Sequence, residues 1–148
     1  MTSQTAAPMR KASLPSSVAE IWHTEILRAA RVLNTHNIVC PCACAWNCLG
    51  RWIQQDAFVD PDTVAVTRFR TKSVLFNTDY TDDTPIETVY TARHEIAHIV
   101  VHTLHPASID HHGPRWHAVC VLLGGVPETS RAPAVVFTPA GRRRTVDP

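Results

Sequence analysis

The sequence has little that would place it in a membrane or in the secreted, disulfide-linked class. No segment reaches the roughly 18 apolar residues that a membrane-spanning helix requires. The opening stretch MTSQTAAPMRKASLPSS has no apolar core of the kind that a secretory signal contains. The five cysteines are an odd number, and thiols inside a cell are normally kept reduced, which argues against a disulfide framework. We therefore expect a soluble, intracellular protein, most simply a cytoplasmic one.

The sequence also lacks an excess of either charge. Its formal net charge is +1, which gives no general argument for a nucleic-acid or membrane partner. The run GRRR at residues 141–144 is shorter than the charge blocks that indicate such binding. We interpret it as part of a solvated tail.

Length and periodicity favour one domain of the α+β class. The 148 residues divide into a polar segment that we expect to be disordered (1–14), a folded part (15–125), and an irregular strap with a basic tail (126–148). Ser17 and Glu20 form a capping box, so a helix is predicted from Ser17 to about Asn34. Its buried face is predicted to consist of five residues at helical spacing, namely Val18, Trp22, Ile26, Ala29 and Leu33.

Residues 37–78 contain four short segments rich in residues that favour strands: NIVCPCACAW, RWIQQ, TVAVTRF and SVLFNT. They predict a small sheet of three or four strands, paired antiparallel. Two helices are predicted to follow. One begins at Thr84-Pro85-Ile86-Glu87 and continues to Pro106, with an apolar face at Ile86, Tyr90, Ala97, Val100, Val101 and Leu104. The other runs from Pro114 to Gly124 and buries Trp116, Val119, Cys120 and Leu123.

Seven of the nine histidines lie in RHEIAHIVVHTLHPASIDHHGPRWHAV, residues 93–119. His94-Glu95-Ile96-Ala97-His98 has the pattern H-E-x-x-H inside a predicted helix. Residues four apart share a helix face, so both imidazoles could bind one zinc ion. Glu95 could then reach a water molecule on that ion and accept its proton as a general base.

A catalytic zinc needs a third protein ligand. His102 lies about 12 Å along the helix from His94, too far for one ion to bind both. The longer pattern H-E-x-x-H-x-x-G-x-x-H fails because Val100 and Leu104 occupy its last two positions. The remaining candidates outside the helix are Glu128, which lies in a Pro-flanked loop, and the histidines of DHHGPRWH. His112, directly before the third helix, is our first choice, with His111 and His117 as alternatives.

H-E-x-x-H followed by H-G-P-x-W resembles the SprT-like zinc metalloproteases, which include the Spartan proteases that act on DNA–protein crosslinks. The matching residues are His94, Glu95, His98, His112, Gly113, Pro114 and Trp116, where Trp116 replaces the Phe that is common in the family. The resemblance spans about residues 16–124. It implies a zincin-like core, one zinc ion on His94, His98 and His112, Glu95 as general base, and a protein or peptide substrate. DNA association is implied by this resemblance alone, and we expect no zinc ribbon of the kind that follows the core in many family members.

We expect the substrate to bind as an extended strand, and SVLFNT is the candidate edge strand, although it could equally be a core strand. Candidate donors to the reaction's oxyanion are His111, Arg115, Tyr80 and Tyr90. Asp110 is near His112 in sequence, but we leave its role unassigned. The two other functions considered are a zinc-binding module without catalysis and a nucleic-acid-associated zinc protein.

Four cysteines fall within CPCACAWNC. If this segment is a strand, Cys40, Cys42 and Cys44 share one face, and Cys48 follows. The spacing C-x-C-x-C is tighter than the C-x₂₋₄-C of most thiolate zinc sites. We therefore favour small buried apolar residues. A second, structural zinc on Cys40, Cys42, Cys44 and Cys48 and a redox role are the alternatives.

Overall fold

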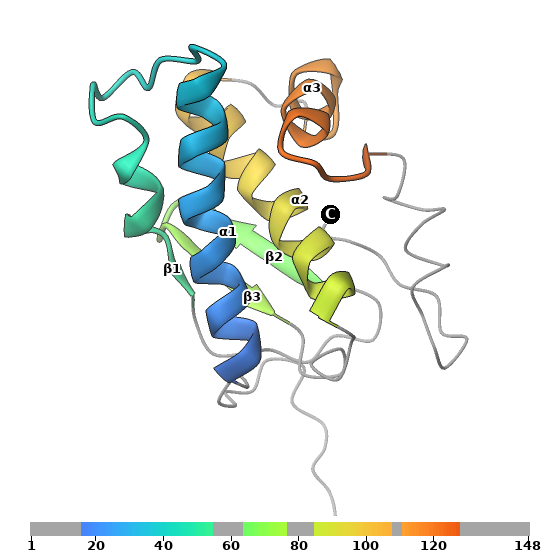
Figure 1. Ribbon diagram of the computed structural model, residues 1–148. Coiled ribbons are helices and arrows are strands. Elements are labelled where there is room, and N and C mark those ends of the chain that lie inside the picture. Colours follow the sequence, from blue (N-terminus) through green and yellow to red (C-terminus); the bar gives the residue numbers. More distant parts are fainter. Residues whose placement is uncertain (1–15, 55–63, 77–84, 108–110, 128–148) are drawn as a thin grey trace, which may run out of the picture.

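The computed structural model describes residues 16–54, 64–76, 85–107 and 111–127. Within them the chain is α+β, with three α-helices, one short 3-10 helix and a three-stranded sheet (Figure 1). The helices are α1 (Ser16–Thr35), α2 (Pro85–Leu104) and α3 (Pro114–Leu122), and the 3-10 helix η1 is Asn47–Arg51. The strands are β1 (Ile53–Gln54), β2 (Ala65–Arg68) and β3 (Ser73–Phe76). The predictions for residues 1–14 and for the tail from residue 128 lie outside the described residues.

The first helix agrees with its prediction. It begins one residue before the predicted cap and ends one residue after Asn34. All five residues predicted for its inner face are buried, and Leu33 has no exposed surface. The ring of Trp22 meets the ring of Phe76 from β3 edge-on, with ring centroids 6.0 Å apart. Helix α1 therefore covers the sheet through its apolar face.

The sheet is mixed, and the prediction of an antiparallel sheet is wrong. Its strand order is β1-β3-β2; β2 is antiparallel to β3, but β1 is parallel to it. The Ile53 N–H donates to the Lys72 carbonyl at 2.9 Å, so β1 enters the sheet beside the turn that leads into β3. Two strands that begin at the same end of a sheet run parallel.

The segment NIVCPCACAW is not a strand, and that prediction is also wrong. Residues 36–46 form bends and turns that lead into η1. Asn37, Ala43, Ala45 and Trp46 have φ angles between 54° and 67°, a left-handed conformation that a β-strand cannot contain. The cysteines consequently do not alternate along one face of an extended chain.

Strand β3 is the middle strand of the sheet, which contradicts the prediction that SVLFNT is an edge. All four of its residues are buried. The alternative interpretation, a plain core strand, is the correct one for Ser73–Phe76. Of the described strands, β2 lies at the edge next to α2.

Helices α1 and α2 lie side by side over one face of the sheet, and α3 packs against α2 (Figure 1). Ala97, Val100 and Val101 of the predicted α2 face are buried, whereas Ile86 is 58% exposed. The first turn directs Glu87 inward instead of Ile86. Helix α3 begins at the predicted Pro114 and ends at Leu122, two residues before the predicted Gly124; Trp116, Val119, Cys120 and Leu123 are all buried. Among the described helices, none combines the length and apolar character needed to cross a membrane.

A charged network fixes α2 between its two neighbours. The Arg93 guanidinium donates to the carboxylate of the buried Glu25 on α1 at 2.9 Å and to the carbonyl of Gly124 after α3 at 3.0 Å. Arg28 donates to the Leu123 carbonyl at 2.6 Å. Because Arg93 immediately precedes His94, this network sets the rotation of α2 at the point where the histidine motif begins.

Candidate metal centre

His94 and His98 lie one turn apart on α2, and both side chains are buried. Their Nε2 atoms are 3.3 Å apart. Helical spacing accounts for this arrangement, because residues i and i+4 project from the same face. The structure thus brings together the two histidines that the motif paired.

His112 comes from the turn that leads into α3. It precedes Gly113, the N-cap residue, and Pro114, the first residue of the helix. Its ring is partly exposed, and its Nε2 lies 3.2 Å from the Nε2 of both His94 and His98. The chain therefore returns a third imidazole to the pair on α2, and it is the residue preferred from the sequence.

The spacing of the three nitrogens fits a metal ion better than mutual hydrogen bonds. A tetrahedral zinc with bonds of about 2.0–2.1 Å to imidazole holds its ligand nitrogens about 3.4 Å apart. The three separations here are 3.2, 3.2 and 3.3 Å. An imidazole Nε2 either donates or accepts, so at most two contacts of such a triangle can be hydrogen bonds. A cation at the centre would satisfy all three nitrogens at once, and the group can hold a metal ion.

Glu95 is fully buried beside the three histidines. Its Oε2 lies 4.0 Å from the Nε2 of His94. The hydroxyl of Thr67 on β2 donates to its Oε1. The carboxylate is thus held next to the nitrogen triangle by a strand that is far from it in sequence.

The Trp116 side chain packs against all three histidines of the centre. Its ring centroid lies 4.7 Å from His94, 5.5 Å from His98 and 4.8 Å from His112. The indole Nε1 donates to the His94 carbonyl at 3.3 Å. A buried indole in contact with three imidazoles restricts their rotation, so it helps to keep the nitrogens in place before an ion arrives.

The other described histidines of the stretch lie outside this group. His102 stacks on Phe69, with ring centroids 4.3 Å apart. Burial, with a smaller contribution from the charge of Lys72, lowers the pKa of His102. His105, His111 and His117 are exposed. These places agree with the interpretation of His102 as a packing residue.

Three of the four candidate oxyanion donors, His111, Arg115 and Tyr90, lie in the described residues. Arg115 is exposed, as is His111, and the Tyr90 ring lies under the Arg93 guanidinium at 5.9 Å. Tyr80, Asp110 and Glu128 lie outside the described residues. The roles considered for these residues remain predictions.

Sequence reasoning missed the contact between Thr67 and Glu95 and the contacts of Trp116 with the histidines. Nothing in TVAVTRF distinguishes Thr67, because its importance depends on which strand passes under α2. Trp116 was predicted to be buried and to match a family position. The pattern H-G-P-x-W contained the signal, since an aromatic residue four positions after His112 follows it into the first turn of α3.

A second group of metal-binding side chains lies at Cys40, Cys44 and Cys48, and the thiol of each is free. Burial raises the pKa of Cys44, but hydrogen bonds from the Cys48 thiol and from the backbone of Cys48 and Trp46 outweigh it and lower the pKa to about 7. Burial and hydrogen bonds with Cys44 and Cys40 raise the pKa of Cys48 to about 12.

No family model, curated protein or solved structure matches the chain. The function of the centre is therefore inferred from its own residues.

Proposed function

We propose that the protein is a zinc-dependent metalloprotease of the zincin type, as its resemblance to the SprT-like proteases implies. The observation that carries the proposal is the nitrogen triangle of His94, His98 and His112, with a buried carboxylate beside it. Three protein ligands leave one position of a tetrahedral ion open, which is the arrangement of catalytic rather than structural zinc.

Each residue around the three histidine nitrogens has a separate role in the proposed hydrolysis. A zinc ion held there would supply Lewis-acid chemistry, which lowers the pKa of water and polarises a carbonyl. In this proposal, Glu95 takes the proton of the attacking water and passes it to the leaving amine. Thr67 fixes the carboxylate by donating to Oε1, so the opposite oxygen, Oε2, is the one directed toward the histidines.

The sheet suggests where an extended substrate would bind. β2 pairs with β3 along one edge, and in the described residues no strand pairs with its other edge. It also carries Thr67, which touches the general base. A peptide added to the open edge of β2 would place its backbone next to Glu95, through hydrogen bonds that tolerate many side chains. The substrate edge is therefore reassigned from β3 to β2.

The decisive experiment compares the wild type with Glu95→Gln, using zinc-loaded protein and unstructured protein or peptide substrates. We expect cleavage by the wild type and a loss of roughly 10²–10⁴-fold in the variant, with the zinc content unchanged, because only the general base is removed. Glu20→Gln makes the same chemical change at an exposed position on α1 and should cleave like the wild type. A wild type that binds zinc but cleaves nothing would leave a metal-binding module without catalysis.

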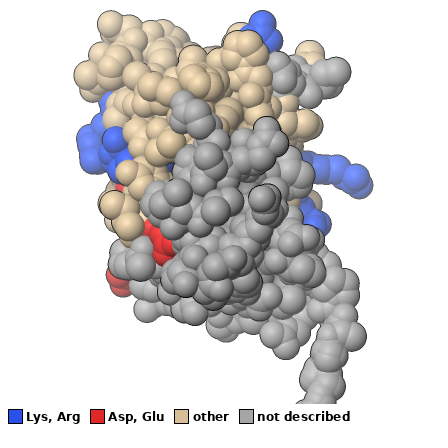
Figure 2. Space-filling view, turned by 90° about the vertical axis from the view of Figure 1, so that its right-hand side faces the viewer, with Lys and Arg blue, Asp and Glu red and all other residues tan. Residues whose placement is uncertain are grey.

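The described side chains on one face of the protein give no argument for a nucleic-acid function. Figure 2 shows Lys and Arg side chains standing apart on this face rather than gathered in one patch. Running the cleavage assay with and without single-stranded and double-stranded DNA tests the DNA association that the family resemblance implies. Stimulation that falls steeply with added salt would indicate phosphate contacts.

A further inference from the structure

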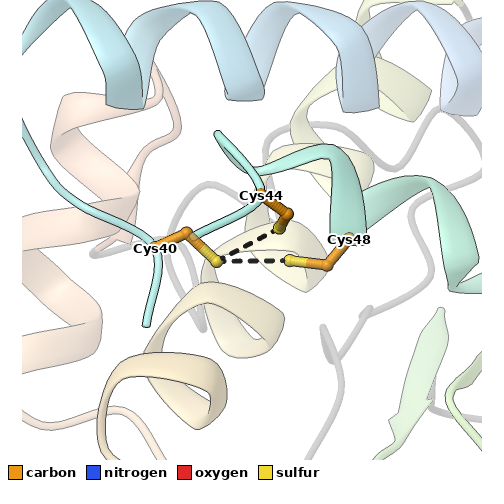
Figure 3. A group of neighbouring side chains, drawn as sticks. All are labelled: Cys40, Cys44 and Cys48. Carbon is orange, nitrogen blue, oxygen red and sulfur yellow. Dashed lines mark hydrogen bonds between the residues drawn. The ribbon is translucent and has the colours of Figure 1, made fainter. Parts of the chain in front are cut away.

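The loop between α1 and β1 brings three thiols to one point. Cys40, Cys44 and Cys48 point toward one another, Cys40 and Cys44 from the loop and Cys48 from η1 (Figure 3). The Cys40 Sγ lies 3.5 Å from the Sγ of both Cys44 and Cys48, and all three sulfurs lie within 4.8 Å of one another. A tetrahedral zinc with bonds of about 2.3 Å to sulfur holds its ligands about 3.8 Å apart. The two separations from the Cys40 sulfur are close to that value.

The backbone turns of the loop bring the three sulfurs together. Two successive turns close with hydrogen bonds from Ala43 N–H to the Cys40 carbonyl and from Asn47 N–H to the Cys44 carbonyl, at 2.9 and 3.0 Å. These turns return the chain every four residues, which is the spacing of the three cysteines.

The same loop contains costly backbone conformations. Ala43, Ala45 and Trp46 have φ angles of 56°, 54° and 67°. A non-glycine residue in the left-handed region costs about 1–2 kcal/mol, and such strain persists only where the surroundings offset it. Part of the offset comes from Trp46, which is fully buried and donates from Nε1 to the Ile38 carbonyl at 2.6 Å. An ion bound by three side chains of this loop would offset more of the conformational energy of these left-handed residues.

We propose that Cys40, Cys44 and Cys48 bind a second, structural zinc ion, distinct from the ion of the histidine centre. On binding, the three thiols release their protons to solvent and become thiolate ligands. The exposed Cys42 lies in the same loop, so its thiolate would supply the fourth ligand and close the coordination sphere, as in other structural zinc sites. The ion would order the loop that leads into β1. Trp52, just after η1, meets Phe69 edge-on, and Phe69 stacks on His102 of α2, so the loop is joined to α2 by ring contacts.

The test counts zinc in the full chain, purified under reducing conditions and freed of loosely bound metal. We expect two zinc ions per chain in the wild type, one in His98→Ala, one in Cys44→Ser and none in the double variant. Cys120→Ala removes the cysteine buried in α3, outside the cluster, and should keep two. One ion in both the wild type and Cys44→Ser would overturn the proposal.

Cobalt substitution provides a readout that needs no change in the loop. Cobalt bound by thiolates has a sulfur-to-metal charge-transfer band, which imidazole ligands do not produce. His98→Ala loaded with cobalt should show this band, and Cys44→Ser should lose it. If His98→Ala binds no cobalt or binds it without the band, the cysteine site does not exist. Neither measurement depends on peptide cleavage, so the proposal can fail while the proposed protease function stands, or the reverse.

Discussion

The histidine centre and the cysteine loop each gather three metal-binding side chains, but by different means. In the centre, two ligands come from one regular helix and the third arrives from a distant turn. In the loop, all three come from nine consecutive residues that have little regular structure. The helix brings its pair together whether or not an ion is present, whereas the loop must hold left-handed residues to do so.

This difference suggests different roles. The histidine nitrogens adjoin a buried carboxylate, and three imidazoles leave an ion one open position, as a reaction requires. Among the described residues, no Asp or Glu is grouped with the three thiols of the cysteine loop. We therefore infer that an ion in the loop would support the fold and that an ion at the histidines would do chemistry.

The strongest test of this comparison removes one ligand from each site in turn and compares the loss of activity with the loss of stability. His98→Ala should abolish metal binding at the centre and lower peptide cleavage by more than about 100-fold, because even outer partners of a ligand are worth 10–100-fold in metal affinity. Its thermal stability should change less than its activity. Cys44→Ser should do the opposite, with a lower Tm and most of its activity retained at a temperature where it is folded. His117→Ala, at an exposed position on α3, is the control for the first change. Equal effects of both variants on activity would remove the proposed division of roles.

The Arg93 network should contribute strongly to stability. In Arg93→Ala, the buried Glu25 carboxylate loses the nearer of its two arginine partners and keeps only Arg28 at 3.6 Å, while the Gly124 carbonyl loses a donor. We expect the free energy of unfolding to fall by about 1–3 kcal/mol, measured by urea denaturation, because a charged hydrogen bond to a buried carboxylate is lost and only the longer Arg28 contact remains. Arg31→Ala, exposed on the same helix as Glu25, should cost far less. A loss below about 0.5 kcal/mol in Arg93→Ala would mean that the network does not fix α2.

Thr67 separates positioning of the general base from metal binding. Thr67→Val keeps the shape of the side chain but removes the hydrogen bond to Glu95. We expect kcat to fall by about 10-fold, since a misplaced base loses part of its contribution while the ligands are untouched. Zinc content should stay the same as in the wild type. Thr24→Val, on the exposed surface of α1, is the matched control. An unchanged kcat would show that Glu95 does not depend on β2.

Trp116 should produce the smallest change. Trp116→Phe keeps an aromatic ring beside the three histidines, but it removes the donor to the His94 carbonyl. We expect stability to fall by about 1 kcal/mol and metal affinity to weaken only modestly. Competition with a zinc chelator measures the second effect. Tighter zinc binding in the Phe variant would contradict the view that the indole holds the ligands in place.

Most of the helical structure could be predicted from local patterns. The inner face of α1, the start of α3 and the pairing of His94 with His98 all follow from patterns within one element. His112 could be chosen because a histidine directly before Gly-Pro lies at a helix entrance. Whether this group binds zinc and cleaves peptides remains a prediction.

The sheet and the cysteine segment could not be predicted in the same way. β-branched residues indicated strands but not their order, because strand order depends on which segments meet after the chain has folded. CPCACAW alternates like a strand, yet burial of Trp46 and the turn hydrogen bonds stabilise a left-handed loop instead.

The sequence by itself determined the helices, the histidine pair and the glutamate between them, because a helix converts spacing of four into proximity. Only the tertiary structure decided that Thr67 reaches Glu95, that Trp116 underlies three imidazoles and that three cysteines converge. The physical reason is that these contacts depend on how turns and strands pack against α1 and α2, and no single local pattern contains that information.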